Sequence, residues 1–126
     1  LYDEGADIVM PVAGPVGLGS AALASELWTD SLKIIGVDVD QYVKDTKNKS
    51  VYLTTVEKGM DSSVLNAIEM AKKNIFTGGL YVGTLANNGV RIAPYHDQAS
   101  AVSNSLNNEI IKLKSSIING FISVKN

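Results

Sequence analysis

"ADIVMPVAGPVGLGSAALASELWTDSLKIIGVDVD", residues 6–40, is the stretch of sequence that decides the fold. Apolar residues run almost without interruption through 6–13 and again through 33–39, which is typical of strands covered on both faces. Residues 15–30 begin with Pro and then gather Ala and Leu, which favour a helix. The stretch therefore predicts a strand–helix–strand unit, whose ligands would bind at the carboxyl ends of its strands.

The rest of the chain continues this alternation. Segments rich in apolar and β-branched residues predict further extended segments at 51–58, 78–85, 89–95 and 121–124. Apolar residues at helical spacing predict helices at 62–74 and 98–120. The polar segment 41–50 predicts a surface loop, and Asn87-Asn88-Gly89 predicts a turn. The expected fold class is α/β, a three-layer lobe with a mainly parallel sheet.

Some single residues have structural roles that follow from these elements. Asp61 is expected to cap the helix at 62–74, and Gly120 to close the helix at 98–120. Trp28, at a helix end, is expected to be a packing residue, and His96, on a loop after a proline, a surface residue. The helix at 62–74 is expected to face the core with its apolar residues, which are Val64, Leu65, Ile68 and Ala71 or Met70.

Composition restricts the function classes. The 126 residues suffice for about one domain, and 45% of them are hydrophobic. Eleven basic against 13 acidic residues give a net charge of −2, which disfavours nucleic acid as a partner. The absence of cysteine excludes disulfides and thiolate zinc sites, and the only histidine, His96, cannot form a metal cluster alone. A Ser-His-Asp site would have to use His96, and nothing in the sequence places a serine beside it, so we expect no catalysis, and we expect no cofactor or metal.

The glycine turn "GPVGLGS" at 14–20 allows competing interpretations. A Walker A phosphate loop is disfavoured because Ser20 and Ala21 stand where Lys and Ser or Thr are required. The segment 17–22 fits the dinucleotide pattern G-x-G-x-x-A, with Asp38 about 20 residues further on, but extra residues separate it from the strand. The structural alternative is that these glycines permit a tight turn and close packing of helix on strand.

Two aspartates, Asp38 and Asp40, close the second apolar run. Two negative charges at the end of a buried strand do not contribute to packing, so they are expected to interact with something else. A sugar diol is one candidate. A carboxylate can accept hydrogen bonds from two adjacent hydroxyl groups. At the level of the residues, Asp38 could bind a ligand or cap the turn after the strand, whereas Asp40, one step further into a polar loop, is expected to cap or order that loop.

Four segments in this order carry a family resemblance: "ADIVMPVAGPVGLG", "IIGVDVDQ", "LTTVEKGMDSSV" and "GGLYVGTLANNGVRIAPY". Together they resemble the C-terminal part of the basic membrane protein (BMP) family, substrate-binding lipoproteins of ABC importers that include purine nucleoside receptors. The resemblance implies a periplasmic-binding-protein type I fold of two lobes with a nucleoside held between them. Residues 1–126 would then be the C-terminal ligand-binding lobe, without the N-terminal lobe or the lipid-attachment signal.

The resemblance also implies which residues bind the ligand. Asp38 would accept hydrogen bonds from ribose hydroxyls, Lys58 would donate to ribose oxygens, and the backbone at Gly14 would line the same pocket. Met10 stands where purine-binding relatives commonly have an aromatic residue that stacks on the base, and its thioether can still pack on a ring. The identity of the base is therefore left open.

The implied protein is anchored by lipid on the outer face of the cell membrane and delivers its nucleoside to the membrane subunits of an ABC importer. Two alternatives stay open at the level of sequence. One is a fragment of a dinucleotide-dependent enzyme that uses the glycine turn. The other is the sensory domain of a regulator, since regulators use the same fold.

Overall fold

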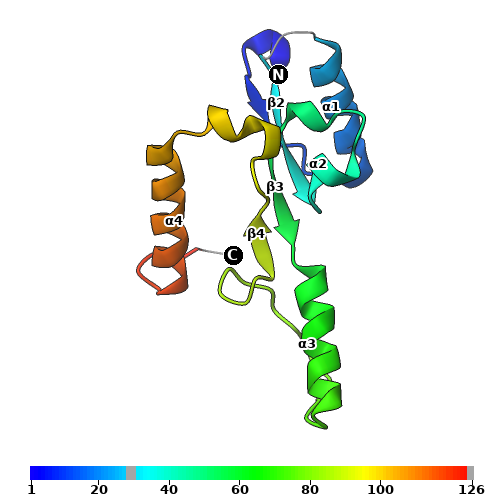
Figure 1. Ribbon diagram of the computed structural model, residues 1–126, viewed down its shortest axis with the longest axis vertical. Helices are drawn as coiled ribbons and strands as arrows, with labels where there is room; N and C mark the ends of the chain where they lie inside the picture. The colour runs from blue at the N-terminus through cyan, green and yellow to red at the C-terminus, as the bar shows by residue number, and fades with distance from the viewer. Residues whose placement is uncertain (28–30, 125–126) are drawn as a thin grey trace. The chain divides into compact units, whose positions relative to one another are not determined.

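The computed structural model describes residues 1–27 and 31–124. Its helices and strands alternate along the chain (Figure 1). They are β1 (Ile8–Val9), α1 (Gly17–Glu26), β2 (Lys33–Asp38), α2 (Gln41–Lys44), β3 (Tyr52–Lys58), α3 (Met60–Lys72), β4 (Val90–Ile92) and α4 (Asn104–Ile118). Short 3₁₀ helices add η1 (Tyr2–Glu4), η2 (Gly14–Val16), η3 (Lys49–Val51) and η4 (His96–Ala101). Trp28, for which the sequence predicts a packing role, lies outside the described residues.

The strands form one sheet in the order β1-β2-β3-β4. β1 pairs in parallel with β2, and β2 pairs in parallel with β3, with Ile35 opposite Thr54 and Asp38 opposite Glu57. The predicted α/β class with a mainly parallel sheet is therefore confirmed. Because parallel strands end at the same edge, the residues that follow β1 and β2 come together at one edge of the sheet.

The chain divides into two compact units. The first comprises Leu1–Glu57 and Ile92–Ser103, and the second comprises Lys58–Arg91 and Asn104–Asn126. The core of the first unit lies between α1 and the first strands of the sheet. Its buried members are Ala21, Ala24, Leu32, Ile34, Val51 and Tyr52. The two alanines of α1 have short side chains, which lets the helix backbone approach β2 closely.

Several predicted elements are shorter or different in the structure. The strand predicted at 6–13 is only the two residues of β1, because Pro11 has no N–H to donate to a sheet. The strands predicted at 78–85 and 121–124 do not form. Part of the loop predicted at 41–50 is instead α2, whose first turn is capped by the side chain of Asp40. The helix predicted at 98–120 starts only at Asn104, because Val102 is extended.

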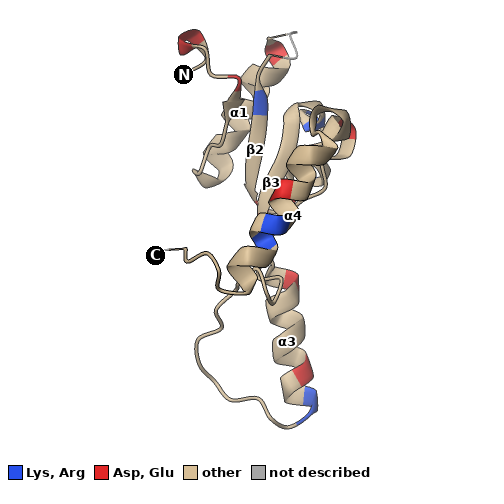
Figure 2. Ribbon diagram, turned by 90° about the vertical axis from the view of Figure 1, so that its left-hand side faces the viewer, with Lys and Arg blue, Asp and Glu red and all other residues tan. Residues whose placement is uncertain are grey.

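In the second unit, α3 begins earlier than predicted. Its N-cap is Gly59, so the prediction that Asp61 is the cap was wrong. Figure 2 shows acidic positions along α3 and a basic position at its C-terminal end, which complements the helix dipole. The apolar residues predicted to face a core are exposed, Val64 and Leu65 by 57% each and Ile68 by 60%. No element among the described residues covers them.

The other loops of the second unit follow the predicted turn signals. Asn88 has a φ of 58° in the predicted turn, and the Asn87 side chain accepts a hydrogen bond from the Thr84 N–H at 2.7 Å. Gly120 follows the end of α4 with a φ of 75° and donates its N–H to the Ile117 carbonyl. The prediction that Gly120 closes this helix is confirmed.

Asp61 pairs with Arg91 rather than capping its helix. Two hydrogen bonds join the guanidinium to the carboxylate, at 3.1 and 3.2 Å. The Arg91 hydrogen bond, followed by one from the Ser62 backbone, holds the pKa of Asp61 below its ordinary value. Both side chains are in contact with solvent, so the pair contributes little to stability.

Replacing Arg91 by Ala should raise the pKa of Asp61 toward its ordinary value, as measured by NMR titration of the side-chain carboxyl. Because the pKa of Asp61 is lowered in the folded protein, its ionised form stabilises the fold at pH values above the ordinary carboxyl pKa. This stabilisation is lost as the pH falls through the lowered pKa of Asp61. Lys72→Ala, which removes a cation from the other end of α3, is the control. An unchanged Asp61 titration in Arg91→Ala would show that the pair does not form in solution.

Gly36 in β2 is required for packing at the sheet edge. A Cβ at this position would lie 2.6 Å from Gln41 Cγ and 2.6 Å from Thr55 Oγ1. We expect Gly36→Ala to lower the free energy of unfolding by about 1–3 kcal/mol, because it overpacks the site. Gly19→Ala in α1 is the matched control, since a Cβ there meets nothing within 4 Å.

Urea denaturation of the full-length protein measures both variants. The control should be neutral or stabilising by about 0.5–1 kcal/mol, because alanine favours the helix more than glycine does. Equal stability of the Gly36→Ala variant and the unmodified protein would contradict this packing.

Candidate functional site

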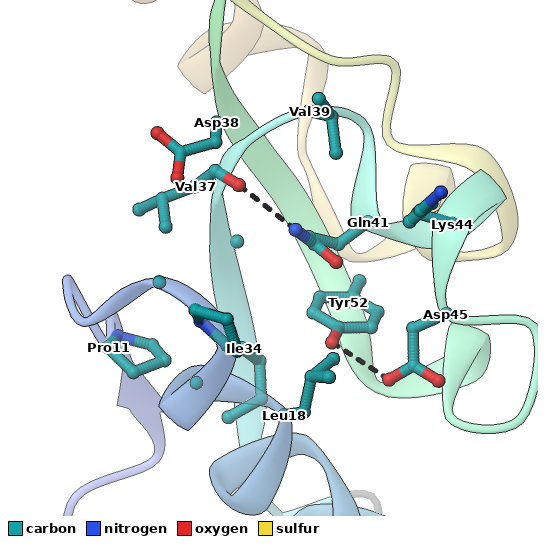
Figure 3. Close-up of a pocket in the computed structure, with 14 residues that line it drawn as sticks. Pro11, Leu18, Ile34, Val37, Asp38, Val39, Gln41, Lys44, Asp45 and Tyr52 are labelled. Atoms are coloured by element: carbon teal, nitrogen blue, oxygen red, sulfur yellow. Dashed lines mark hydrogen bonds between the residues drawn. The ribbon is translucent and has the colours of Figure 1, made fainter.

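A cavity of about 400 Å³ lies in the first unit at the carboxyl end of β2 (Figure 3). The turn before α1 forms one wall, and the segment from β2 into α2 forms another. Apolar side chains provide much of the lining: Pro11, Leu18, Ile34, Val37 and Val39. Polar groups come from Asp38, Gln41, Lys44, Asp45 and Tyr52. An apolar cavity with a few polar groups is typical of a small-molecule site.

Asp38 is the last residue of β2 and is half-buried. Its φ is 75°, in the left-handed region that side chains other than Asn and Asp rarely adopt. Such a conformation costs free energy and persists only where the surrounding structure holds it, often at a functional site. In Figure 3, Asp38 and Gln41 lie on opposite sides of the strand end, so the carboxylate is directed away from the Gln41 amide.

Gln41 holds the turn that follows β2. Its backbone N–H donates to Thr55 Oγ1 at 3.1 Å, and its side-chain amide donates to the Val37 carbonyl at 3.0 Å. Thr55 is only 1% exposed, so the first bond satisfies a buried hydroxyl. These two bonds fasten the start of α2 to both β2 and β3.

A second carboxylate in the cavity lining, Asp45, has a structural role. It accepts hydrogen bonds from the Tyr52 hydroxyl at 3.0 Å and from the side-chain amide of Asn48 at 2.9 Å. Burial, and then the hydrogen bond to Asp45, raises the pKa of Tyr52 well above its ordinary value. Tyr52 therefore stays protonated and donates to Asp45 at every physiological pH.

Asp40 caps α2, as predicted. One carboxylate oxygen accepts the backbone N–H of Tyr42 at 3.1 Å, and the other lies 2.8 Å from Nε2 of His96. The His96 ring stacks on the Tyr42 ring with centroids 4.1 Å apart and planes 9° from parallel. The prediction that His96 is a surface residue was wrong, because its side chain is only 24% exposed and is paired with Asp40.

The structure places the predicted site residues in different positions. Gly14 and Asp38 both line the cavity, so the carboxyl ends of β1 and β2 do bring them together. Met10 is 43% exposed and does not contribute to the lining. Lys58, the last residue of β3, belongs to the second unit. The binding roles of all four remain predictions.

Sequence reasoning assigned no role to Gln41, Asp45 or Tyr52. Gln41 carried a signal, since it directly follows the two aspartates of the quoted motif "GVDVDQ". Tyr52 and Asp45 carried none, because a strand tyrosine and a loop aspartate are common and their hydrogen bond depends on the fold.

The structure weakens the dinucleotide interpretation. That fingerprint needs its first glycine in the turn that follows the strand, close to the pyrophosphate. Here Gly17 is already helical, with a φ of −58°, and η2 occupies the turn. Gly19 lies inside α1. Gly17 fits the structural alternative, because it lets the helix start approach Pro11, whereas a Cβ at Gly19 would meet nothing within 4 Å.

Across residues 1–27 and 31–124, no three His, Asp or Glu side chains gather as metal ligands would. No helix in this described part of the chain is both long and apolar enough to cross a membrane.

Removing the Tyr52 hydroxyl should weaken the wall of the cavity. We expect Tyr52→Phe to lower the free energy of unfolding by about 1–2 kcal/mol, because Asp45 loses a buried hydrogen-bond donor. Urea denaturation measures the loss, with Tyr81→Phe at a position that is 41% exposed as the control. Equal effects of the two substitutions would contradict the structural role of the Tyr52–Asp45 bond.

Comparison with known proteins agrees with this architecture. The family model described as "ABC transporter substrate-binding protein PnrA-like" (Bmp) matches residues 1–126. Basic membrane protein D of Borreliella burgdorferi (strain JD1) is 33% identical over 129 residues, which cover 98% of this chain and 36% of that protein.

A solved structure, an ABC transporter system solute-binding protein from Conexibacter woesei DSM 14684, matches with a TM-score of 0.69. Its sequence identity is 22%, and the match covers 99% of this chain and 39% of that one. The chain thus spans 36% and 39% of the lengths of these two relatives. The chain belongs to the Bmp family of PnrA-like ABC transporter substrate-binding proteins.

Proposed function

We propose that the protein containing this chain is the substrate-binding component of an ABC importer and that it binds a nucleoside through its ribose. Membership of the family supports the first part. The second part rests on one observation: Asp38, at the carboxyl end of β2, lines a cavity of about 400 Å³. Ligand pockets commonly have volumes of roughly 300–1,000 Å³.

The chemistry of Asp38 suits a ribose. An ionised carboxylate has two oxygen atoms and no proton, so it can accept hydrogen bonds from two adjacent hydroxyl groups. Hydrogen bonds to a charged group contribute roughly 1.5–3 kcal/mol each. Asp45 also lines the cavity, and its oxygens accept hydrogen bonds from Tyr52 and Asn48.

Three further contacts belong to the proposal. The backbone at Gly14, which has a φ of 53° and lines the cavity, would pass close to the ligand. Lys58 would donate to ribose oxygens, and Met10 would pack on the base. Met10 is exposed enough for a ligand to cover it.

The proposed protein is larger than this chain. Residues 1–126 would contribute the C-terminal ligand-binding lobe, and the sequence outside it would contribute an N-terminal lobe and a lipid anchor on the outer face of the cell membrane. The nucleoside would close the two lobes, and the membrane subunits of the importer would recognise the closed form. The protein would bind and release its ligand without chemical reaction and without a cofactor.

Removing the Asp38 carboxylate tests this proposal. In the full-length protein, Asp38→Ala should weaken binding of a ribonucleoside by about 2–5 kcal/mol, or roughly 30-fold to several-thousand-fold in Kd. A 2′,3′-dideoxynucleoside lacks both hydroxyl groups, so the unmodified protein should bind it weakly and the variant should barely distinguish the two ligands. Isothermal titration calorimetry measures all four combinations.

Asp3→Ala is the control, because Asp3 is an exposed acidic residue at the start of the chain. It should leave affinity for both ligands unchanged. Equal losses for Asp38→Ala on the ribosyl and dideoxy ligands would show that Asp38 stabilises the loop and does not bind the sugar.

A further inference from the structure

We infer that His96 is a positioning residue for the binding site: through Asp40, it holds the turn that presents Asp38 to the ligand. The inference rests on the proposed role of Asp38 in binding. Asp40 and His96 are 56 residues apart in sequence, yet both belong to the first compact unit. Neither residue lines the cavity, so both would act on the ligand only through Asp38.

The contact between His96 and Asp40 has the geometry of a strong hydrogen bond. The distance from Nε2 to Oδ2 is 2.8 Å, and the carboxylate can only accept, so Nε2 carries the proton and donates it. Solvent exposure is 24% for the His96 side chain and 20% for that of Asp40. Water therefore competes less with this bond than with one on an exposed surface.

The Asp40 carboxylate joins two elements at once. Its other oxygen, Oδ1, accepts the Tyr42 N–H at the start of α2, while Oδ2 accepts from His96 at the start of η4. Stacking of the His96 ring on Tyr42 adds a second contact between the same two elements. The ammonium group of Lys49 lies over the Tyr42 ring, 5.3 Å from its centre, which is within the range of a cation–π interaction.

The segment that carries His96 is anchored on both sides. Before it, the Ala93 N–H donates to the Thr55 carbonyl at 2.8 Å, and the Ala93 carbonyl accepts from Thr54 Oγ1 at 2.7 Å. After it, the Gln98 side-chain amide donates to the Ser50 carbonyl at 2.5 Å. His96 itself has a φ of 44°, which persists only where neighbouring contacts hold it.

The contact between His96 and Asp40 supports the turn that follows β2, whose backbone is strained. Asp38 has a φ of 75°, and the Val39 N–H makes a tight bond back to the Val37 carbonyl at 3.0 Å. Gln41 fixes the end of the turn to β2 and β3, and Asp40 fixes its middle to η4. Without His96, one of these two attachments is lost, and Asp38 can leave the geometry that two hydroxyl groups require.

A double-mutant cycle in the full-length protein tests the inference. His96→Ala should raise the Kd for a ribonucleoside by about tenfold, less than Asp38→Ala, because the carboxylate remains but is poorly placed. It should change the Kd for the 2′,3′-dideoxy ligand little. In the Asp38→Ala background, His96→Ala should cause no further loss. His96→Gln, which can donate to Asp40, should restore part of the affinity.

Equal losses on the two ligands, or additive losses in the double variant, would overturn the inference while leaving the proposed role of Asp38 intact. Asp97→Ala, a substitution of the neighbouring exposed residue, is the control for general effects on η4.

A ligand-free measurement separates this inference from the proposed function. Hydrogen exchange should be faster at the amides of residues 39–42 in His96→Ala than in the unmodified protein, because the cap of α2 is weakened. Unchanged exchange would overturn the inference whatever the ligand is. Failure of the unmodified protein to bind any nucleoside would instead overturn the proposed function, and faster exchange would still support the link from His96 to the turn.

Discussion

Parallel pairing of β2 with β3 is the constraint on which the rest of the first unit depends. It buries Ile34 and Thr55 almost completely and sets Asp38 opposite Glu57 at the edge of the sheet. The buried Thr55 hydroxyl then accepts the N–H of Gln41, which directs the chain away from the strand and into α2. The cavity exists because this turn and the turn before α1 leave the sheet at the same edge.

The carboxylates around this edge differ in function because their surroundings differ. Asp45 is occupied by Tyr52 and Asn48 and stabilises the wall of the cavity. Asp40 joins α2 to η4. Asp38 lines the cavity with a backbone φ in the left-handed region. Strained backbone positions of this kind are common at functional sites. A sequence that ends a strand in "DVD" thus separates a proposed binding role from a structural one by two residues.

Sequence patterns predicted the elements in which local preference and burial agree. The runs at 33–39 and 51–58 became β2 and β3, and the Ala-rich segment became α1. They did not predict α2, because it depends on the Asp40 cap together with the non-local bond from Gln41 to Thr55. They misjudged His96 for the same reason, since its partner is 56 residues away. The apolar face of α3 was predicted as core, but no described element covers it.

Calorimetry of the full-length protein tests the proposed recognition of a ribose most directly. The titrants are a ribonucleoside, its free base, free ribose, the nucleoside 5′-monophosphate and NAD. The account predicts clear binding of the ribonucleoside, with the free base much weaker because it offers no diol to Asp38. Equal affinity for the free base and the nucleoside, or binding of NAD alone, would contradict it.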